Sequence, residues 1–406
     1  MKSSYSLSAL LAAAGLACGA VLLLGGAGPG DPASLPGARA EIDAAKYASL
    51  QAALDALPAE GGLVRLPAGE FEISQPLVIR TGDVTLVGAG TATHIKNTNT
   101  EGKSALILEH PLAKESQDNR LWRIRLADFR ITGNPKSGVG IEARLVNEIF
   151  LDGVTVSEHG GDGVLLDHCY EDPRVCSSLI TYNKGTGLNL LGCHDIVVSA
   201  CQFEENRDAL HCFDGFNLCM TGNCLDDHLG NGVVIENTYG SVVSGNMIEE
   251  CAGTAIILDR DCYGIALSAN VIAHNGAGVD LRDAHGCSVS ANTLTIMKTD
   301  AVRVSANSGR IAVTGNSISN SYIGEDKVRR GDNDLAAAGI TLAGATDVAI
   351  TGNQFSSVRP FAIGVSEGAR RVAVVGNVLT DVASQQNKLE ASVVDDNVLP
   401  AAPPQE

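Results

Sequence analysis

Aromatic residues are scarce in this chain. They make up 4% of its 406 residues, with a single tryptophan, against 45 glycines. Because aromatic side chains supply much of the buried area of a globular core, this composition suits a thin solenoid better than a thick, compact domain. Positive charge is also low relative to negative charge, since the chain has 29 Lys and Arg and 47 Asp and Glu and therefore a net charge of −18. That balance argues against nucleic acid and anionic membranes as partners.

The chain also lacks a sustained apolar period of 3.6 residues, so helical repeats are excluded. What it has instead is an Asn that recurs about every 22 to 24 residues, after Gly or Ala and usually Ser or Thr. A fixed period of this length is typical of a solenoid, in which each repeat buries its apolar face only against its neighbours. The repeated residues are Asn223, Asn246, Asn270, Asn292, Asn316, Asn353 and Asn377.

The residues between these Asn positions predict short strands. A Gly followed by alternating aliphatic residues stands about 14 residues upstream of an Asn, as at 187–190, 232–235, 278–281 and 339–342. A second alternating run lies directly before each Asn, as at 311–313. Strands of three to five β-branched residues between Gly and Asn turns exclude leucine-rich repeats. Two or three strands per turn predict an all-β fold, the parallel β-helix.

With these features the chain resembles the right-handed parallel β-helix proteins of the pectin-lyase-like superfamily. The stretch from Tyr47 to Ile95 adds to the likeness, with an amphipathic segment at 49–57 followed by the strand-like runs 61–71 and 84–90. In such proteins a helix caps the first coil, which would otherwise expose apolar residues and strand edges. The resemblance covers about residues 45 to 398. It implies the fold and leaves activity open, because lyases, hydrolases, epimerases and proteins without catalysis share it.

Both ends of the chain are predicted to lie outside the coils. Residues 1–40 carry an apolar run from Leu7 to Leu24 after Lys2 and read as a signal peptide or an N-terminal anchor. We therefore expect a secreted, periplasmic or cell-envelope protein. Residues 41–95 are predicted to form the cap and first coils, residues 96–398 the β-helix, and residues 399–406 a flexible tail.

Ten of the 11 cysteines lie between Cys169 and Cys287. Export would permit disulfides, and Cys169–Cys176, which bracket a short loop, form the best candidate pair. Small buried thiols filling interior positions are the favoured interpretation for most of the ten. Their spacing does not match a tetrahedral zinc site. The Asn repeat is also interpreted as structural, since Asn tolerates tight turns and its amide can bond the Asn of the next coil.

Function is therefore sought at irregular positions on the strand after each Gly, where side chains alternate inward and outward. The first outward row reads Glu142, Leu165, Asn189, His211, Val234, Ile257, Asp280, Arg303, Thr341 and Gly364. The second reads Arg144, Asp167, Leu191, Phe213, Glu236, Asp259, Arg282, Ser305, Ala343 and Ser366. Charge gathers in the middle of both rows. Neighbouring coils lie about 4.8 Å apart, so Glu236, Asp259 and Arg282 are predicted to stack, with Asp280 and Arg303 beside them and His211 at the edge.

This cluster is compatible with an exposed salt-bridge ladder or with a binding groove. The groove is supported by an insert at 322–336, which makes the Asn316–Asn353 spacing longer than the others and carries Lys327, Arg329 and Arg330. The insert would form one wall and add positive charge. Arg260 and Tyr263 are further predicted substrate contacts. A bound calcium ion could also neutralise the acidic groove, so calcium is retained as a candidate cofactor.

Lyases and epimerases of this superfamily remove the proton beside a sugar carboxylate, which calcium, Arg or an equivalent group neutralises. By their chemistry, Arg282 or Arg303 could neutralise that carboxylate, and His211 or Tyr263 could act as base or acid. Hydrolysis needs two carboxyl groups, which Glu236 and Asp259, about 5 Å apart, or Glu236 and Asp280, nearer to 10 Å apart, could supply. The Asp-Pro-His-Asp motif of alginate epimerases and the Asn-Thr-Asp and Gly-His-Gly motifs of polygalacturonases are missing.

Asp226-Asp227-His228 is a separate candidate for cation binding or acid–base work, against a solvated turn. Taken together, the sequence predicts a monomeric, exported β-helix protein that acts on polysaccharide. A lyase or epimerase of a glycan containing uronic acid is favoured. A glycoside hydrolase and a non-catalytic protein that binds cell-envelope glycan are the alternatives.

Overall fold

The computed structural model describes residues 35–320, 337–380, 382 and 393–395. The predictions for the apolar run at 7–24, for the insert with Lys327, Arg329 and Arg330, and for the tail at 399–406 lie outside these ranges. The chain divides into two units, 1–38 and 39–406, and the description concerns the second. No helix within the described ranges is long and apolar enough to cross a membrane.

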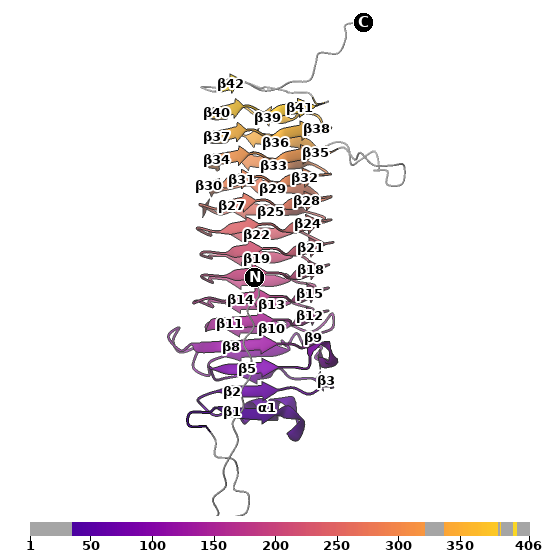
Figure 1. Ribbon diagram of the computed structural model, residues 1–406, viewed down its shortest axis with the longest axis vertical. Coiled ribbons are helices and arrows are strands. Elements are labelled where there is room, and N and C mark those ends of the chain that lie inside the picture. Colours follow the sequence, from indigo (N-terminus) through magenta and orange to yellow (C-terminus); the bar gives the residue numbers. More distant parts are fainter. Residues whose placement is uncertain (1–34, 321–336, 381, 383–392, 396–406) are drawn as a thin grey trace, which may run out of the picture. The chain divides into compact units, whose positions relative to one another are not determined.

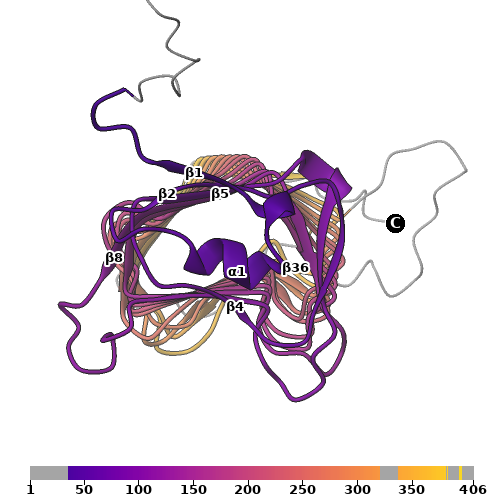
Figure 2. The ribbon, with the colours of Figure 1, turned by 90° about the horizontal axis from the view of Figure 1, so that it is seen from below.

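The second unit is a right-handed parallel β-helix, as predicted (Figure 1). Each coil contributes strands to three parallel sheets, and Figure 2 looks along the stack and shows its sides. The periodic sequence produces this arrangement because Val, Ile and Leu at alternate positions of each short strand point into a shared apolar interior. The first strand, Ala40–Asp43, already pairs with the strand of the next coil.

Sheet A has 17 strands among the described residues: β1 (Ala40–Asp43), β2 (Gly62–Arg65), β5 (Val84–Val87), β8 (Leu121–Ala127), β11 (Val146–Asp152), β14 (Arg174–Cys176), β17 (Val197–Ser199), β20 (Cys219–Thr221), β23 (Val242–Ser244), β26 (Cys262–Tyr263), β27 (Ala266–Ser268), β30 (Ala284–His285), β31 (Ser288–Ser290), β34 (Gly309–Thr314), β37 (Thr346–Thr351), β40 (Arg370–Val375) and β42 (Val393–Asp395).

Sheet B has 13 strands in the same ranges: β3 (Gly69–Ile73), β6 (Thr93–Asn97), β9 (Arg130–Thr132), β12 (Thr155–Ser157), β15 (Leu179–Thr181), β18 (Gln202–Glu204), β21 (Cys224–Asp226), β24 (Met247–Glu249), β28 (Val271–Ala273), β32 (Thr293–Thr295), β35 (Ser317–Ser319), β38 (Gln354–Ser356) and β41 (Val378–Thr380).

Sheet C has 12 described strands: β4 (Leu77–Ile79), β7 (Leu106–Glu109), β10 (Ile141–Arg144), β13 (Val164–Asp167), β16 (Leu188–Leu191), β19 (Leu210–Phe213), β22 (Val233–Glu236), β25 (Thr254–Asp259), β29 (Ala277–Leu281), β33 (Asp300–Ser305), β36 (Ala338–Ala343) and β39 (Ile363–Val365).

Among the residues that the structure describes, helical structure is confined to the start of this unit. The α-helix α1 (Leu50–Asp55) follows the 3-10 turn η1 (Ala44–Lys46), and a second 3-10 turn, η2, spans Gly90–Ala92. Ser49 caps α1, since its hydroxyl accepts a hydrogen bond from the Ala52 backbone N–H. Gln51 fixes the helix to β4 through hydrogen bonds with the backbone of Val78. Figure 2 shows α1 lying across the opening of the first coil.

The repeated Asn residues form the predicted ladder between sheets A and B. Asn246 shows the pattern: its Nδ2 donates to Asn270 Oδ1 at 3.0 Å and to the Met220 carbonyl at 3.1 Å, and its Oδ1 accepts from the backbone N–H and the Nδ2 of Asn223. The residue before it, Gly245, has a φ of +67°, which explains the recurring small residue. The Asn side chains therefore satisfy the polar groups of a buried turn.

A second interior ladder, which the sequence analysis missed, lies at the corner after sheet B. Asn183 Nδ2 donates to Asn206 Oδ1 at 2.9 Å, and the corresponding residue one coil earlier, His159, donates its backbone N–H to Asn183 Oδ1. His228 occupies the same position one coil after Asn206. Both histidines are buried, and burial lowers the pKa of each to about 4. They are therefore neutral parts of the interior.

The expectation of mostly buried thiols is confirmed, because seven of the ten described cysteines are buried. Cys169 and Cys176, the best candidate pair for a disulfide, are not bonded to each other. Both residues are free thiols: Cys169 lies inside, with Sγ 3.6 Å from the Ala143 carbonyl, whereas Cys176 contacts Ser199 Oγ on the outer side of sheet A. The strand alternation therefore directs the two side chains to opposite sides of the wall.

Candidate functional site

The outer face of sheet C carries the charged residues that the sequence analysis selected. The predicted register is confirmed there: His211 pairs with Val234, Glu236 with Asp259, and Asp280 with Arg303. Arg282 follows the end of β29 rather than pairing within it. It nevertheless returns to the same face through contacts with two carboxylates. The charged side chains therefore lie in consecutive coils on one surface.

Glu236 is the centre of a first cluster. Its Oε2 lies 2.8 Å from His211 Nε2, and its Oε1 lies 3.0 Å from Arg260 Nε. The Arg260 guanidinium also lies 5.7 Å from the centroid of the Phe213 ring. Both oxygens of Glu236 are thus engaged by cationic or protonatable groups. We call these four residues the histidine cluster.

Arg282 is the centre of a second cluster. Its Nε lies 2.8 Å from Asp280 Oδ2, and its Nη1 lies 3.7 Å from Asp259 Oδ2. The second oxygen of Asp280, Oδ1, is buried and has no hydrogen-bond partner. Arg303 lies beside this pair and, within the part of the chain that the structure describes, forms no ion pair. A cavity of about 410 Å³ joins these groups and is lined by Thr254, Ala277, Asp280, Arg282, Thr299, Asp300, Arg303 and Ser305.

We call this hollow the arginine pocket. Asp300, Thr254 and Thr299 were missed by the sequence analysis because they precede the two outward rows. Asp300 begins β33 and accepts a hydrogen bond from the Thr341 hydroxyl. Thr254 and Asp300 stand three residues before Ile257 and Arg303 of the first outward row, with the buried Ala255 and Ala301 after them, so a two-residue alternation does not select them.

The two clusters are too far apart to act on one sugar ring. His211 lies on β19 and Arg303 on β33, four coils along the sheet. At about 4.8 Å per coil, this separates the two residues by about 19 Å. His211 therefore cannot move a proton on a group that Arg303 neutralises. A polymer lying along the coils could contact both clusters.

Tyr263 lies on another side of the stack. It belongs to β26 of sheet A, beyond the corner that follows sheet C, and it extends a column of rings, one per coil. Within this column, Tyr170 and His194 have ring centroids 4.3 Å apart, and Phe216 and Tyr239 have centroids 5.4 Å apart. Tyr263 is therefore placed with an aromatic column rather than with either charged cluster.

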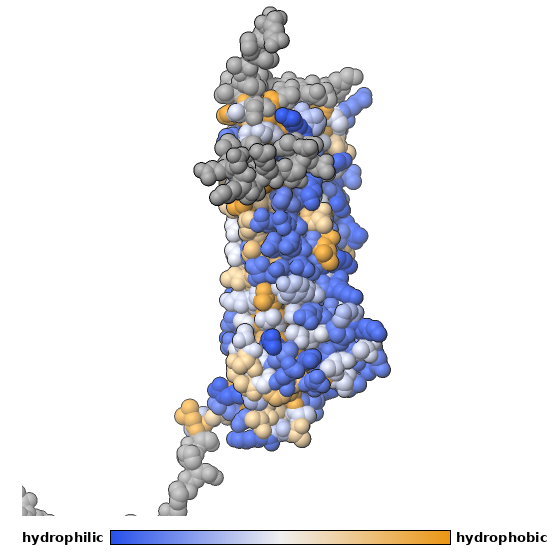
Figure 3. All heavy atoms as spheres, turned by 90° about the vertical axis from the view of Figure 1, so that its right-hand side faces the viewer, coloured by the Kyte–Doolittle hydropathy of each residue, from blue (hydrophilic) through white to orange (hydrophobic). Residues whose placement is uncertain are grey.

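Asp226, Asp227 and His228 do not form one site, because the chain turns at Asp227, where φ is +53°. His228 points into the interior, whereas Asp226 and Asp227 point outward. The two aspartates meet Glu250 of the next coil instead, with carboxylate oxygens of all three within 4.8 Å of one another. A hydrogen bond with Glu250, together with burial and the nearby negative charges, raises the pKa of Asp227. Such oxygens are the ligands that calcium prefers. Figure 3 shows that this side, formed by sheet B, is largely hydrophilic.

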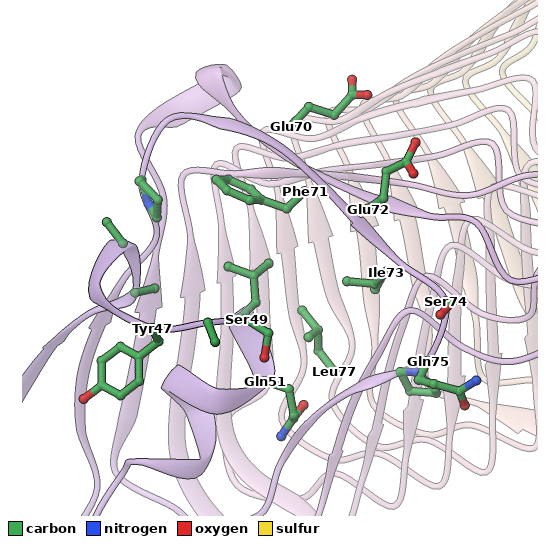
Figure 4. Close-up of a pocket in the computed structure, with 16 residues that line it drawn as sticks. Tyr47, Ser49, Gln51, Glu70, Phe71, Glu72, Ile73, Ser74, Gln75 and Leu77 are labelled. Atoms are coloured by element: carbon green, nitrogen blue, oxygen red, sulfur yellow. The ribbon is translucent and has the colours of Figure 1, made fainter.

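Another hollow lies beside α1 at the first coils. Its volume is about 610 Å³, and its walls come from the helix and from the segment of β3 that follows it. Phe71, Ile73 and Leu77 form an apolar floor, and Glu70 and Glu72 form a rim (Figure 4). It lacks the basic residues of the arginine pocket, so it does not suit an acidic ligand.

Comparisons with known proteins agree with this architecture. The family model described as "Right handed beta helix region" matches residues 137–318 and 254–398, which together span more than half of the chain. No curated protein sequence matches.

Among solved structures, the A-module of the mannuronan C-5 epimerase AlgE6 of Azotobacter vinelandii is 17% identical, with a TM-score of 0.61 over 90% of this chain and 100% of the module. The α-1,3-glucanase catalytic unit of Streptomyces thermodiastaticus is 17% identical, with a TM-score of 0.54 over 90% of this chain and 71% of that unit. PfbA, a surface adhesin of Streptococcus pneumoniae, is 12% identical, with a TM-score of 0.54 over 82% of this chain and 93% of the adhesin.

At these identities the structural likeness shows the fold and no particular activity. The repeated Asn turns, the three parallel sheets and the match of the family model agree with one another. The chain belongs to the right-handed β-helix family.

Proposed function

We propose that the outer face of sheet C binds an acidic polysaccharide and that the arginine pocket removes the proton beside a sugar carboxylate, as a lyase or an epimerase does. The observation that carries this proposal is the environment of Arg303. Arg303 is a cation without an ion pair among the described residues, in a chain of net charge −18, and it lines a cavity beside Arg282. Two guanidinium groups around one hollow suit a carboxylate ligand.

The chemistry follows from the arrangement of the pocket. Removing the proton moves negative charge onto the sugar carboxylate, and Arg303 would stabilise that charge as it develops. Asp280 is the proposed proton acceptor, because it is a carboxylate that lines the pocket between Arg282 and Arg303. In a lyase the bond to the leaving sugar then breaks and an unsaturated uronate forms. In an epimerase a proton returns from the opposite side.

Hydrolysis by Glu236 and Asp259 is disfavoured by their contacts. Glu236 is bound by His211 and Arg260, and Asp259 by Arg282. These contacts occupy carboxylate oxygens that a hydrolase would need to present to the substrate and to water. The structural neighbours include a mannuronan epimerase and a glucanase, so glycan chemistry does occur on this fold.

The test is a panel of uronic-acid and neutral polysaccharides, with and without calcium, in deuterated water. Ultraviolet absorbance reports unsaturated product, deuterium in the recovered polymer reports proton exchange, and reducing ends report hydrolysis. Absorbance, or deuterium uptake without absorbance, supports the lyase or the epimerase respectively. Reducing ends without either signal, or binding without any turnover, would overturn the proposed reaction.

Variants locate the activity. Arg303→Ala is expected to lower turnover by about ten-fold to a hundred-fold through lost charge stabilisation. Asp280→Asn should abolish turnover while the polymer still binds. The matched control is Arg370→Ala, which removes an exposed arginine at the start of β40 in sheet A. Equal losses in Arg303→Ala and Arg370→Ala would show that general charge, and not the pocket, is responsible.

A further inference from the structure

One side of sheet A is almost free of charge over five consecutive coils. We call residues 194–200, 216–222, 239–245, 263–269 and 285–291 the neutral face, and the strand register aligns these segments side by side. Asp195 is the only charged residue among these 35. At the chain's overall charged fraction of 19%, about seven would be expected. The repeat architecture does not require a face without charge, because both flanking sheets carry charged outward positions in the same coils.

The neutral face exposes apolar surface. Phe216 is 41% exposed, Tyr263 48% and Val242 38%. Contiguous exposed apolar surface of this kind marks interaction sites, and the centres of protein interfaces are rich in aromatic residues and poor in charge. The ring stacking between Phe216 and Tyr239 also holds these side chains in place. Little side-chain freedom would therefore be lost on binding.

The charges and the rings narrow the class of partner. The face offers no Lys or Arg to an anionic glycan, and its one carboxylate, Asp195, accepts a hydrogen bond from Asn217 at 2.8 Å. A neutral sugar needs an open ring face for stacking, but Phe216 lies between His194 and Tyr239, and the Tyr263 ring lies against Gly286. A second uncharged protein surface fits better, because ring edges and aliphatic side chains can interdigitate there.

A second copy of this chain supplies such a surface. Two copies with net charge −18 repel each other, and contact through sheet B would bring acidic clusters such as Asp226, Asp227 and Glu250 together. Contact through the neutral face keeps these acidic clusters apart, so only the longer-range repulsion between the two acidic bodies remains. Five coils at about 4.8 Å by seven residues at no more than about 3.3 Å give at most about 550 Å² per copy, because the second residue of each segment has a positive φ and bends the chain. The total of at most about 1,100 Å² lies in the range of weak, transient interfaces.

We propose that the neutral face is a self-association surface, through which two copies of this chain form a weak, reversible two-fold dimer. This departs from the monomer predicted from sequence, and it is independent of the proposed glycan chemistry. A two-fold contact uses the same patch on both copies, so one substitution alters the interface twice. Salt should strengthen the dimer, because it screens the repulsion between the two acidic bodies.

Sedimentation equilibrium of the purified protein over a range of concentrations tests the proposal. The average mass should rise from one chain towards two with concentration and with added salt. Val242→Glu places a charge within the neutral face and should shift the dimer midpoint at least about ten-fold higher. The matched control, Val271→Glu, adds the same charge at an equally exposed strand position of sheet B, with 40% exposure, and should dimerise as the unmodified protein does.

A second measurement needs no charged variant. Cys219 is an exposed thiol within the neutral face, and Cys224 is a partly buried thiol on sheet B. Alkylation of Cys219 relative to Cys224 should slow as protein concentration rises. A single-chain mass at all concentrations, or equal behaviour of the two valine variants, overturns the proposal. So does loss of neutral-polysaccharide binding in Val242→Glu without any change in mass, which would assign the face to glycan.

Discussion

The Asn ladder and the outer face of sheet C are built from the same repeat but differ in regularity. Seven Asn residues occupy equivalent buried positions, and each bonds the next through the same atoms. On sheet C, equivalent positions change from Asn189 to His211, Val234 and Asp280 along the coils. A residue type that repeats in every coil stabilises the stack of coils, because every coil needs the same hydrogen bonds. A position whose residue type varies between coils can take part in binding or catalysis.

Removing a ladder residue should have the largest effect. Asn246→Ala leaves the backbone N–H and the Nδ2 of Asn223 and the Met220 carbonyl buried without their partner. Unsatisfied buried groups cost about 1–3 kcal/mol each, so we expect a loss of about 3–5 kcal/mol in the free energy of unfolding. Chemical denaturation measures it. The matched control, Asn307→Ala at an exposed turn, should change stability by less than about 0.5 kcal/mol.

The next prediction concerns pH: lowering the pH should reduce the free energy of unfolding through the two buried histidines. His159 and His228 have pKa values of about 4 when folded against 6.5 when exposed. Because the folded values are lower, the unfolded chain binds more protons between about pH 6.5 and 4, and stability falls as the pH is lowered through that window. The loss approaches about 3 kcal/mol per histidine at about 1.4 kcal/mol per pKa unit.

Substitution isolates this contribution, because His228→Asn restores the residue that neighbouring coils use at that position. Unfolding free energies at several pH values should show a shallower decline in His228→Asn than in the unmodified protein. The control Asn307→Ala, which changes no titratable group, should leave the slope unchanged. Parallel curves for His228→Asn and the unmodified protein would mean that the buried ring does not control the acid response.

The smallest stability effect is expected on the charged face. Glu236→Gln keeps the shape of the side chain but weakens the contacts with His211 and Arg260, which are only partly buried. We expect a loss of about 1 kcal/mol or less in thermal or chemical unfolding. A cost equal to that of Asn246→Ala would break the comparison, because it would make the irregular face as structural as the ladder.

The sequence was most informative where it repeats. The Asn period predicted the coils, the ladder and the register of both outward rows on sheet C, because a two-residue alternation fixes which side chains face outward. It predicted buried thiols for the same reason. It failed where a side chain's partner lies in another coil: Cys169 and Cys176 are close in the chain but point to opposite sides, and Asp226 finds Glu250 rather than His228.

The sequence by itself determined that this chain is a β-helix with charge gathered on one face. Only the tertiary structure decided how that charge is divided, with His211 and Arg260 bound to Glu236 and with Arg282 and Arg303 around a cavity about 19 Å from His211. It also decided that Tyr263 lies on a neutral side. The physical reason is that the sequence period fixes the coil to which each residue belongs and whether its side chain points inward or outward. Ion pairs and cavities depend instead on distances between side chains of different coils and of neighbouring sheets.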